Sequence, residues 1–214
     1  MNALFLAALA AGLSYWPASH LALDPVLLVV WKGAGVALLA LWAAGRARSA
    51  DGWLLAAVMT LGAAGDVLLE VALTLGGAVF LCGHLVAIAL YLRNRRAGAG
   101  WGPWLLVPVV GGAGTMLPAD PAAAPGMALY GIGVAAMAAC AAMSRFRLAA
   151  VGALMFVISD LLIFARLGPL AGSWLPSLLV WPLYFLGQAL IAWDVGRRAW
   201  GPSRRRGAPA PARP

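Results

Sequence analysis

The sequence predicts an all-α membrane protein: a helical bundle that crosses the bilayer eight times, with both termini in the cytoplasm. Of its 214 residues, 64% are hydrophobic and only 10% are charged, whereas a soluble domain has about 25% charged residues. The apolar segments are too long and too many for a single signal peptide, and they lack the alternating pattern of an outer-membrane barrel. Helices, which satisfy their own backbone hydrogen bonds, are therefore the expected way of crossing the bilayer.

Eight apolar segments are separated by breaks rich in Gly, Pro and Asp. They run over residues 2–18, 25–44, 53–73, 76–92, 103–118, 125–143, 147–166 and 174–194. Several are shorter than the about 20 residues that a helix needs to cross the hydrocarbon core. We expect them to form one domain over residues 1–200. The Arg-, Pro- and Ala-rich stretch 201–214 is expected to be a disordered cytoplasmic tail that lies against anionic lipids.

Arginines predict the orientation of these segments. They follow the second, fourth, sixth and eighth segments and continue into the tail, and only Arg166 breaks this pattern. The positive-inside rule then places both termini in the cytoplasm, at what we expect to be the plasma membrane of a bacterium. Because the positive charge follows the topology, we expect membrane lipids and no nucleic acid as partners. Asp24 and Asp194, at segment ends, are expected at the membrane interface.

The third segment contains two acidic residues one helical turn apart, Asp66 and Glu70. A carboxylate near the centre of a bilayer costs about 2.5–3.5 kcal/mol on insertion scales, so its presence needs a reason. Other segments contribute further polar residues: Lys32, His84, Ser159, Asp160, Tyr184 and Gln188. With a rise of about 1.5 Å per residue, most of them fall at overlapping depths in the outer half of the membrane. We therefore predict that four helices meet around a polar pocket.

Structural explanations exist for each of these residues. Lys32 could reach the headgroups with its long stem, and Glu70 could be solvated near the surface. Asp66 and Asp160 could instead form an ion pair with Lys32. The remaining polar groups could simply join helices by hydrogen bonds: His84, Tyr184 and Gln188.

Two buried carboxyl groups beside one cation rarely share the same protonation state, so one is a candidate general acid and the other a candidate general base. No nucleophile elbow, Ser-His-Asp grouping or glycine-rich phosphate loop occurs in the chain. Ser159 is adjacent to Asp160 and thus about 100° away from it around a helix, which is poor geometry for a nucleophile and its base. A zinc site needs about three ligands, and the chain has only two His, so we expect no metal and no cofactor.

In this order over eight segments, the polar residues resemble those of the YhhN-like lysoplasmalogenase family. The resemblance covers essentially the whole chain and rests on Lys32, Gly65-Asp66 with Leu69, Phe80 with Gly83-His84, Ser159-Asp160, and Tyr184 with Gln188. Two departures concern substrate preference: Gly33 stands where the family often has proline, and Tyr91 lies later than the aromatic residue that commonly follows the family's His.

The resemblance implies an enzyme that hydrolyses the vinyl ether bond of a lysophospholipid, a lysoplasmalogen, to a fatty aldehyde and glycerophosphoethanolamine or glycerophosphocholine. It implies Asp66 and Asp160 as the acid and base. The implied substrate-binding residues are Lys32, Glu70, His84, Ser159, Tyr184 and Gln188. The alternative is a proton-coupled transporter or another lipid-handling membrane protein, because membrane-embedded carboxylates and His also form proton relays. A purely structural membrane protein is the third possibility.

Overall fold

The computed structural model describes residues 2–199, which form eight α-helices and one short 3-10 helix and include no β-strand. The elements are α1 (Ala3–Ala18), α2 (Pro25–Ala44), α3 (Ala50–Val71), α4 (Leu73–Arg93), η1 (Gly102–Leu105), α5 (Leu106–Met116), α6 (Ala124–Met143), α7 (Arg147–Arg166) and α8 (Leu175–Ala199). Every predicted apolar segment contains a helix, so the all-α prediction is confirmed for these residues. The predicted tail at 201–214 lies outside the described residues.

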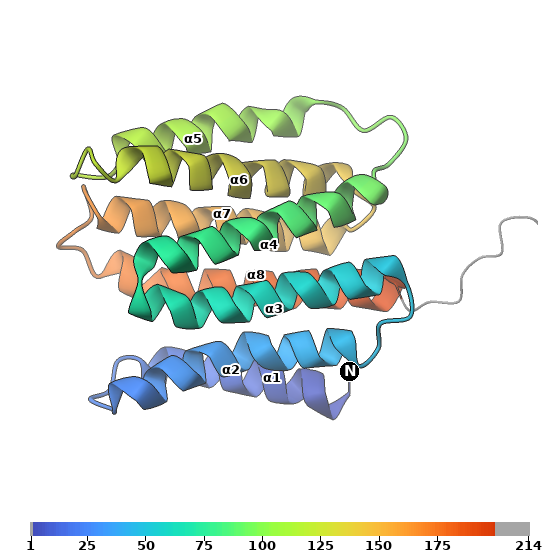
Figure 1. The fold of residues 1–214 in the computed structure, drawn as a ribbon, viewed down its shortest axis with the longest axis horizontal. Coiled ribbons are helices and arrows are strands. Elements are labelled where there is room, and N and C mark those ends of the chain that lie inside the picture. The colour runs from blue at the N-terminus through green and yellow to red at the C-terminus, as the bar shows by residue number, and fades with distance from the viewer. Residues whose placement is uncertain (1, 200–214) are drawn as a thin grey trace, which may run out of the picture.

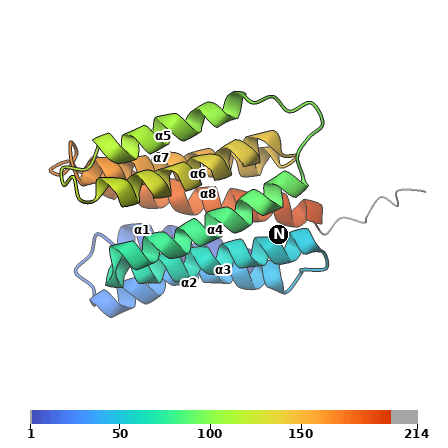
Figure 2. The same cartoon turned by 45° about the horizontal axis from the view of Figure 1, so that its top comes forward.

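The helices run side by side in one bundle, with α1 and α2 at one edge and α5 and α6 at the other (Figure 1). Most consecutive helices pack as antiparallel neighbours, but α4 packs on α6 instead of α5. The last helix, α8, contacts α1, α2, α3 and α7 and thereby joins the two halves of the bundle (Figure 2). This arrangement brings residues of α2, α3, α4, α6, α7 and α8 to a common interior.

Six of the helices are long and apolar enough to cross a membrane: α2, α3, α4, α6, α7 and α8. The chain is therefore built as an integral membrane protein. Eight spans were expected, and these six helices account for six of them. The other two helices are shorter: α1 has 16 residues and α5 has 11. At about 1.5 Å per residue, both are shorter than a hydrocarbon core of about 30 Å.

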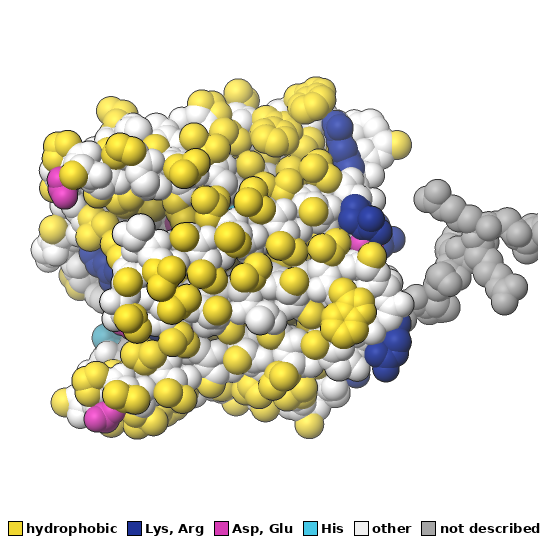
Figure 3. Space-filling view, in the orientation of Figure 1, with side chains coloured by type: hydrophobic (Ala, Val, Ile, Leu, Met, Phe, Trp, Pro, Cys, Tyr) yellow, Lys and Arg dark blue, Asp and Glu magenta, His cyan; other side chains and the backbone are white. Residues whose placement is uncertain are grey.

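Charged side chains are unevenly distributed between the two ends of the bundle. Most of the Lys and Arg side chains in view lie at the end near the N-terminus, whereas the opposite end shows acidic side chains and a smaller basic patch (Figures 1 and 3). At the basic end, Asp51 binds two of the loop arginines: its Oδ1 accepts from Arg93 Nε at 3.3 Å and its Oδ2 from Arg145 at 3.5 Å. This asymmetry is the pattern on which the predicted orientation depends.

The junction of α3 and α4 differs from the expected one. The sequence analysis ended the third apolar segment at residue 73 and began the fourth at residue 76, but the structure ends α3 at Val71 and joins it to α4 through Ala72, whose φ of −153° and ψ of 111° are extended. Gly76 lies inside α4, where an added Cβ would come within 2.5 Å of the backbone nitrogen of Leu69. This glycine therefore permits the first turn of α4 to touch the last turn of α3 rather than ending a helix.

Two aspartates at helix ends are caps of different kinds. Exposed Asp24 accepts hydrogen bonds from the backbone N–H groups of Val26 and Leu27, so it caps its own helix. Asp194 was expected at the interface, but its side chain is fully buried. Its Oδ2 accepts from the backbone N–H of Leu148 at 2.8 Å, so it caps the first turn of α7 from α8, and its Oδ1 accepts from Arg198 at 2.8 Å. Packing of α8 against α7 is what buries it.

A proline shapes α8 near the site. Pro182 lies inside the helix and has no N–H, so the carbonyl of Leu178 loses its helical donor. The indole N–H of Trp16 on α1 donates to this carbonyl at 3.0 Å. One turn further, Trp181 donates to the carbonyl of Gly12 at 2.7 Å. Helix α1 thus holds the part of α8 that precedes Tyr184.

Candidate functional site

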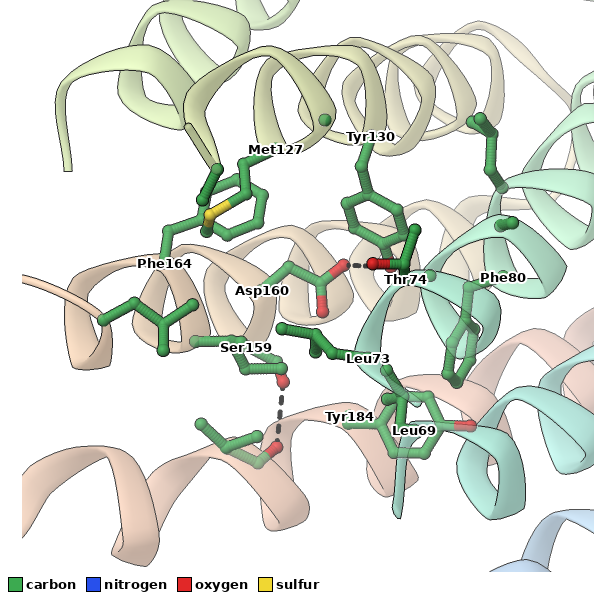
Figure 4. Close-up of a pocket in the computed structure, with 18 of the residues that line it drawn as sticks. Leu69, Leu73, Thr74, Phe80, Met127, Tyr130, Ser159, Asp160, Phe164 and Tyr184 are labelled. Carbon is green, nitrogen blue, oxygen red and sulfur yellow. Dashed lines mark hydrogen bonds between the residues drawn. The ribbon is translucent and has the colours of Figure 1, made fainter. Parts of the chain in front are cut away.

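The bundle encloses a cavity of about 480 Å³ with a mostly apolar wall. Its lining residues come from six helices, α2, α3, α4, α6, α7 and α8, and from the loop before α6 (Figure 4). Several of them are exposed on the outside of the bundle, and these mark the mouth between the starts of α4 and α6: Leu73, Thr74, Ala122, Gly126 and Leu129. The cavity is therefore reached from the side of the bundle near one end.

Asp66 on α3 forms one polar point of the cavity wall. Its side chain is buried, with 2% of the residue exposed. The hydroxyl of Tyr184 on α8 donates a hydrogen bond to Asp66 Oδ2 at 2.8 Å. Gln188, one turn further along α8, donates through Nε2 to the Tyr184 oxygen at 3.4 Å. Asp66 thus has a fixed donor on one carboxyl oxygen.

Asp160 on α7 forms a second polar point and has a matching arrangement. It is 4% exposed, and the hydroxyl of Tyr130 on α6 donates to its Oδ2 at 2.9 Å (Figure 4). The Nε2 atom of His84 lies 3.2 Å from the same hydroxyl. Each buried carboxyl group is therefore held by a tyrosine from another helix, and each tyrosine by a further polar side chain.

Close contact between α7 and α8 sets the relative position of these groups. A Cβ added at Gly152 would lie 2.4 Å from the carbonyl oxygen of Gly187, so the two backbones touch at this point. Nearer the cavity, the hydroxyl of Ser159 donates to the carbonyl of Val180 at 3.0 Å (Figure 4). Ser159 lines the cavity, but its proton is used to join the two helices.

Aromatic rings make up much of the wall beside the carboxyl groups. The ring of Tyr184 lies 5.8 Å from that of Phe80, 5.0 Å from that of Phe156 and 5.5 Å from that of Trp181, measured between centroids. Rings packed at these distances fix the orientation of Tyr184, whose hydroxyl donates to Asp66.

Lys32 and Glu70 form an ion pair beside the cavity, Lys32 Nζ donating to Glu70 Oε1. The Lys32 side chain is 16% exposed and lines the cavity, whereas that of Glu70 is 43% exposed and does not. Lys32 therefore pairs with Glu70. Within residues 2–199, neither Asp66 nor Asp160 is bound in an ion pair.

His84 and Gln188 lie behind the main wall. Both line a second cavity of about 20 Å³ together with Phe80 and Phe156, which also face the main one. Gln188 packs on Gly62, where an added Cβ would meet the Gln188 Nε2 atom at 2.9 Å. These two polar residues reach the carboxyl groups through the tyrosines and not directly.

The sequence matches the YhhN family over residues 27–195, which is most of the chain and includes every residue of the site described above. The chain belongs to the YhhN family. Comparison with curated proteins and with solved structures gave no match.

In this member of the YhhN family, five of the eight predicted site residues line one cavity: Lys32, Asp66, Ser159, Asp160 and Tyr184. The other three lie outside the cavity wall: Glu70, His84 and Gln188. Within residues 2–199, no three His, Cys, Asp or Glu side chains are grouped so that they could hold a metal ion.

Tyr130 is the residue that the sequence analysis missed. It stands in a segment composed largely of Ala and Gly and carries a hydroxyl group into the membrane-spanning part of the chain. A polar side chain inside an apolar segment is the criterion that selected Tyr184. The same criterion, applied to every segment, finds Tyr130 as well.

Proposed function

We propose that this YhhN family protein is a lysoplasmalogenase: an intramembrane hydrolase that cleaves the vinyl ether bond of lysoplasmalogens to a fatty aldehyde and glycerophosphoethanolamine or glycerophosphocholine. We also propose that it lies in a bacterial plasma membrane with both termini cytoplasmic. The observation that carries the proposal is the pair of buried carboxyl groups, Asp66 and Asp160, in the wall of an otherwise apolar cavity. Family membership supports the same reaction.

A single-chain lipid suits the shape and polarity of this cavity. Its wall is apolar enough for an alkenyl chain, and its mouth between α4 and α6 is lined by exposed residues that a membrane-dissolved lipid could pass. Lys32 lines the cavity and can bind the lipid phosphate as a point charge, with Glu70 holding its ammonium group in place. The substrate is then bound by its headgroup at Lys32 and by its chain among the apolar residues.

Cleavage of a vinyl ether needs an acid and a base but no covalent nucleophile. One carboxylic acid protonates the β-carbon of the vinyl ether, which leaves an oxocarbenium ion at the neighbouring carbon. Water adds to that ion, and the second carboxylate accepts a proton from this water. The resulting hemiacetal then collapses to the aldehyde and the glycerol hydroxyl. Asp66 and Asp160 are the proposed pair, in analogy to the two carboxyl groups of glycoside hydrolases. Substrate plus one water gives both products, so the step balances.

The tyrosines support this chemistry by occupying one oxygen of each carboxyl group. Tyr184 and Tyr130 both donate to Oδ2 atoms. In residues 2–199, the Oδ1 atoms of Asp66 and Asp160 make no hydrogen bond, so they are the oxygens available to the substrate and to water. Fixed donors of this kind hold a reacting group at a constant position and charge.

Aldehyde release from a purified lysoplasmalogen in detergent tests the proposal. The wild-type protein is compared with Asp66→Asn and Asp160→Asn, with folding checked by thermal unfolding of each variant. We expect aldehyde from the wild type and a loss of about 100- to 10,000-fold in each variant. Activity that survives both changes would refute the acid–base pair. No aldehyde from the folded wild type would refute the hydrolase and favour the transporter, which works only across a sealed membrane.

A further inference from the structure

The small cavity behind the main wall has room for one water molecule. About 20 Å³ is open to the centre of a water molecule there, and about 10–15 Å³ of such space is sufficient to hold one. A water also needs polar partners, and Gln188 and His84 both line this cavity. Gln188 Oε1 is buried and has no hydrogen-bond partner within the described residues.

The direction of the hydrogen bonds shows what such a water has to do. Tyr184 uses its proton on Asp66, so its oxygen is an acceptor and Gln188 must present its NH₂ group to it. The amide oxygen of Gln188 then points away from Tyr184 and needs a donor. A buried acceptor that is left without a donor destabilises the folded protein.

The hydrogen bond of Tyr130 likewise determines the tautomer of His84. Tyr130 uses its proton on Asp160, so His84 Nε2, at 3.2 Å from the Tyr130 oxygen, must carry a proton to donate. In the neutral ring Nδ1 is then an acceptor, and among residues 2–199 it has no hydrogen-bond partner. Two acceptors without donors thus belong to residues that line one small cavity.

We propose that one buried water occupies this cavity and donates one proton to Gln188 Oε1 and the other to His84 Nδ1. It joins Asp66, Tyr184 and Gln188 to His84, Tyr130 and Asp160 in one hydrogen-bonded network. All hydrogen bonds run outward from the water toward the two carboxyl groups. Gln188 and His84 are therefore positioning residues, which keep both tyrosine hydroxyls directed at the Oδ2 atoms.

Nitrogen NMR of histidine-labelled protein tests the water site without any assay of activity. The chain has only two His, and a His20→Gln variant identifies the signals of His84. We expect His84 in the Nε2–H tautomer, with Nδ1 at the shift of a hydrogen-bonded acceptor and with magnetisation transfer from a long-lived water to the ring. In Gln188→Leu, which has a similar volume, we expect the Nδ1 shift to move. An Nδ1–H tautomer, or an Nδ1 shift indifferent to Gln188→Leu, would overturn the proposal.

The positioning role rests on the proposed hydrolase function and is tested in the aldehyde assay. We expect Gln188→Leu to lower kcat by about 10- to 100-fold, the range typical of residues that position a reacting group without contacting the substrate. KM should change by less than about twofold. Tyr91→Phe is the control, since the Tyr91 hydroxyl is buried and without a hydrogen-bond partner in the described residues. An unchanged kcat in Gln188→Leu would overturn the role. A wild type without aldehyde would refute the hydrolase and leave the NMR result to decide the water site.

Discussion

The hydroxyl of Tyr184 donates to Asp66 Oδ2 at 2.8 Å across 118 positions of the chain. This contact joins α8 to α3, and its counterpart from Tyr130 to Asp160 joins α6 to α7. Both pairs face the same cavity, so two carboxyl groups far apart in the sequence receive the same kind of hydrogen-bond donor.

The tyrosine donors are tested by Tyr184→Phe and Tyr130→Phe, each of which removes a single oxygen. The carboxyl group then loses its fixed donor, and we expect kcat for aldehyde release to fall by about 10- to 100-fold. Steady-state kinetics in detergent measure this, with Tyr91→Phe as the matched control that should retain full activity. If all three Phe variants behave alike, the two hydrogen bonds have no part in the reaction.

Lys32→Met tests headgroup binding. It removes the ammonium group at the cavity wall but keeps an apolar stem, so we expect KM for a lysoplasmalogen to rise about tenfold, equivalent to about 1.4 kcal/mol. Arg166→Met, which removes an exposed cation at the end of α7, is the control and should change KM little. Equal effects of the two substitutions would point to general surface charge instead of a phosphate site.

The mouth of the cavity is tested at Gly126, an exposed lining residue with nothing within 4 Å of an added Cβ. Gly126→Trp should fold normally and obstruct the entrance, so kcat/KM should fall while thermal stability stays constant. Gly112→Trp on α5 is the control, because Gly112 has equally open space but does not line the cavity. A normal kcat/KM in Gly126→Trp would mean that the substrate enters elsewhere.

Asp194 is expected to affect stability rather than activity. Asp194→Ala removes the acceptor for the first turn of α7 and the partner of Arg198, which should lower the free energy of unfolding by about 2 kcal/mol. Asp194→Asn keeps an oxygen acceptor and loses only the charge, so its loss should be smaller. Thermal unfolding in detergent compares the three proteins. An alanine variant as stable as the wild type would show that the cap is dispensable.

Composition and the breaks between apolar segments were sufficient to predict the helices. Apolar segments bounded by Gly, Pro and Asp must satisfy their backbone groups internally in a bilayer, so each segment reads as a helix. Depth along those helices placed Lys32, Asp66, Glu70, Asp160 and Tyr184 in one layer, and all of them except Glu70 line the cavity. The family resemblance rested on the same residues and agrees with the family match over residues 27–195.

The partners of these residues were decided by tertiary structure. Depth says nothing about which face of a helix meets which neighbour, so the sequence left open whether Lys32 pairs with Asp66, Asp160 or neither. The rotation and packing of whole helices decided these partners. Lys32 forms an ion pair with Glu70, and the two tyrosines donate hydrogen bonds, Tyr184 to Asp66 and Tyr130 to Asp160. The same packing buried Asp194 beneath α7. The apolar segments of a sequence and the breaks between them therefore determine which residues fall in membrane-spanning helices and at what position along each helix, whereas hydrogen bonds between helices depend on close packing that only the folded chain establishes.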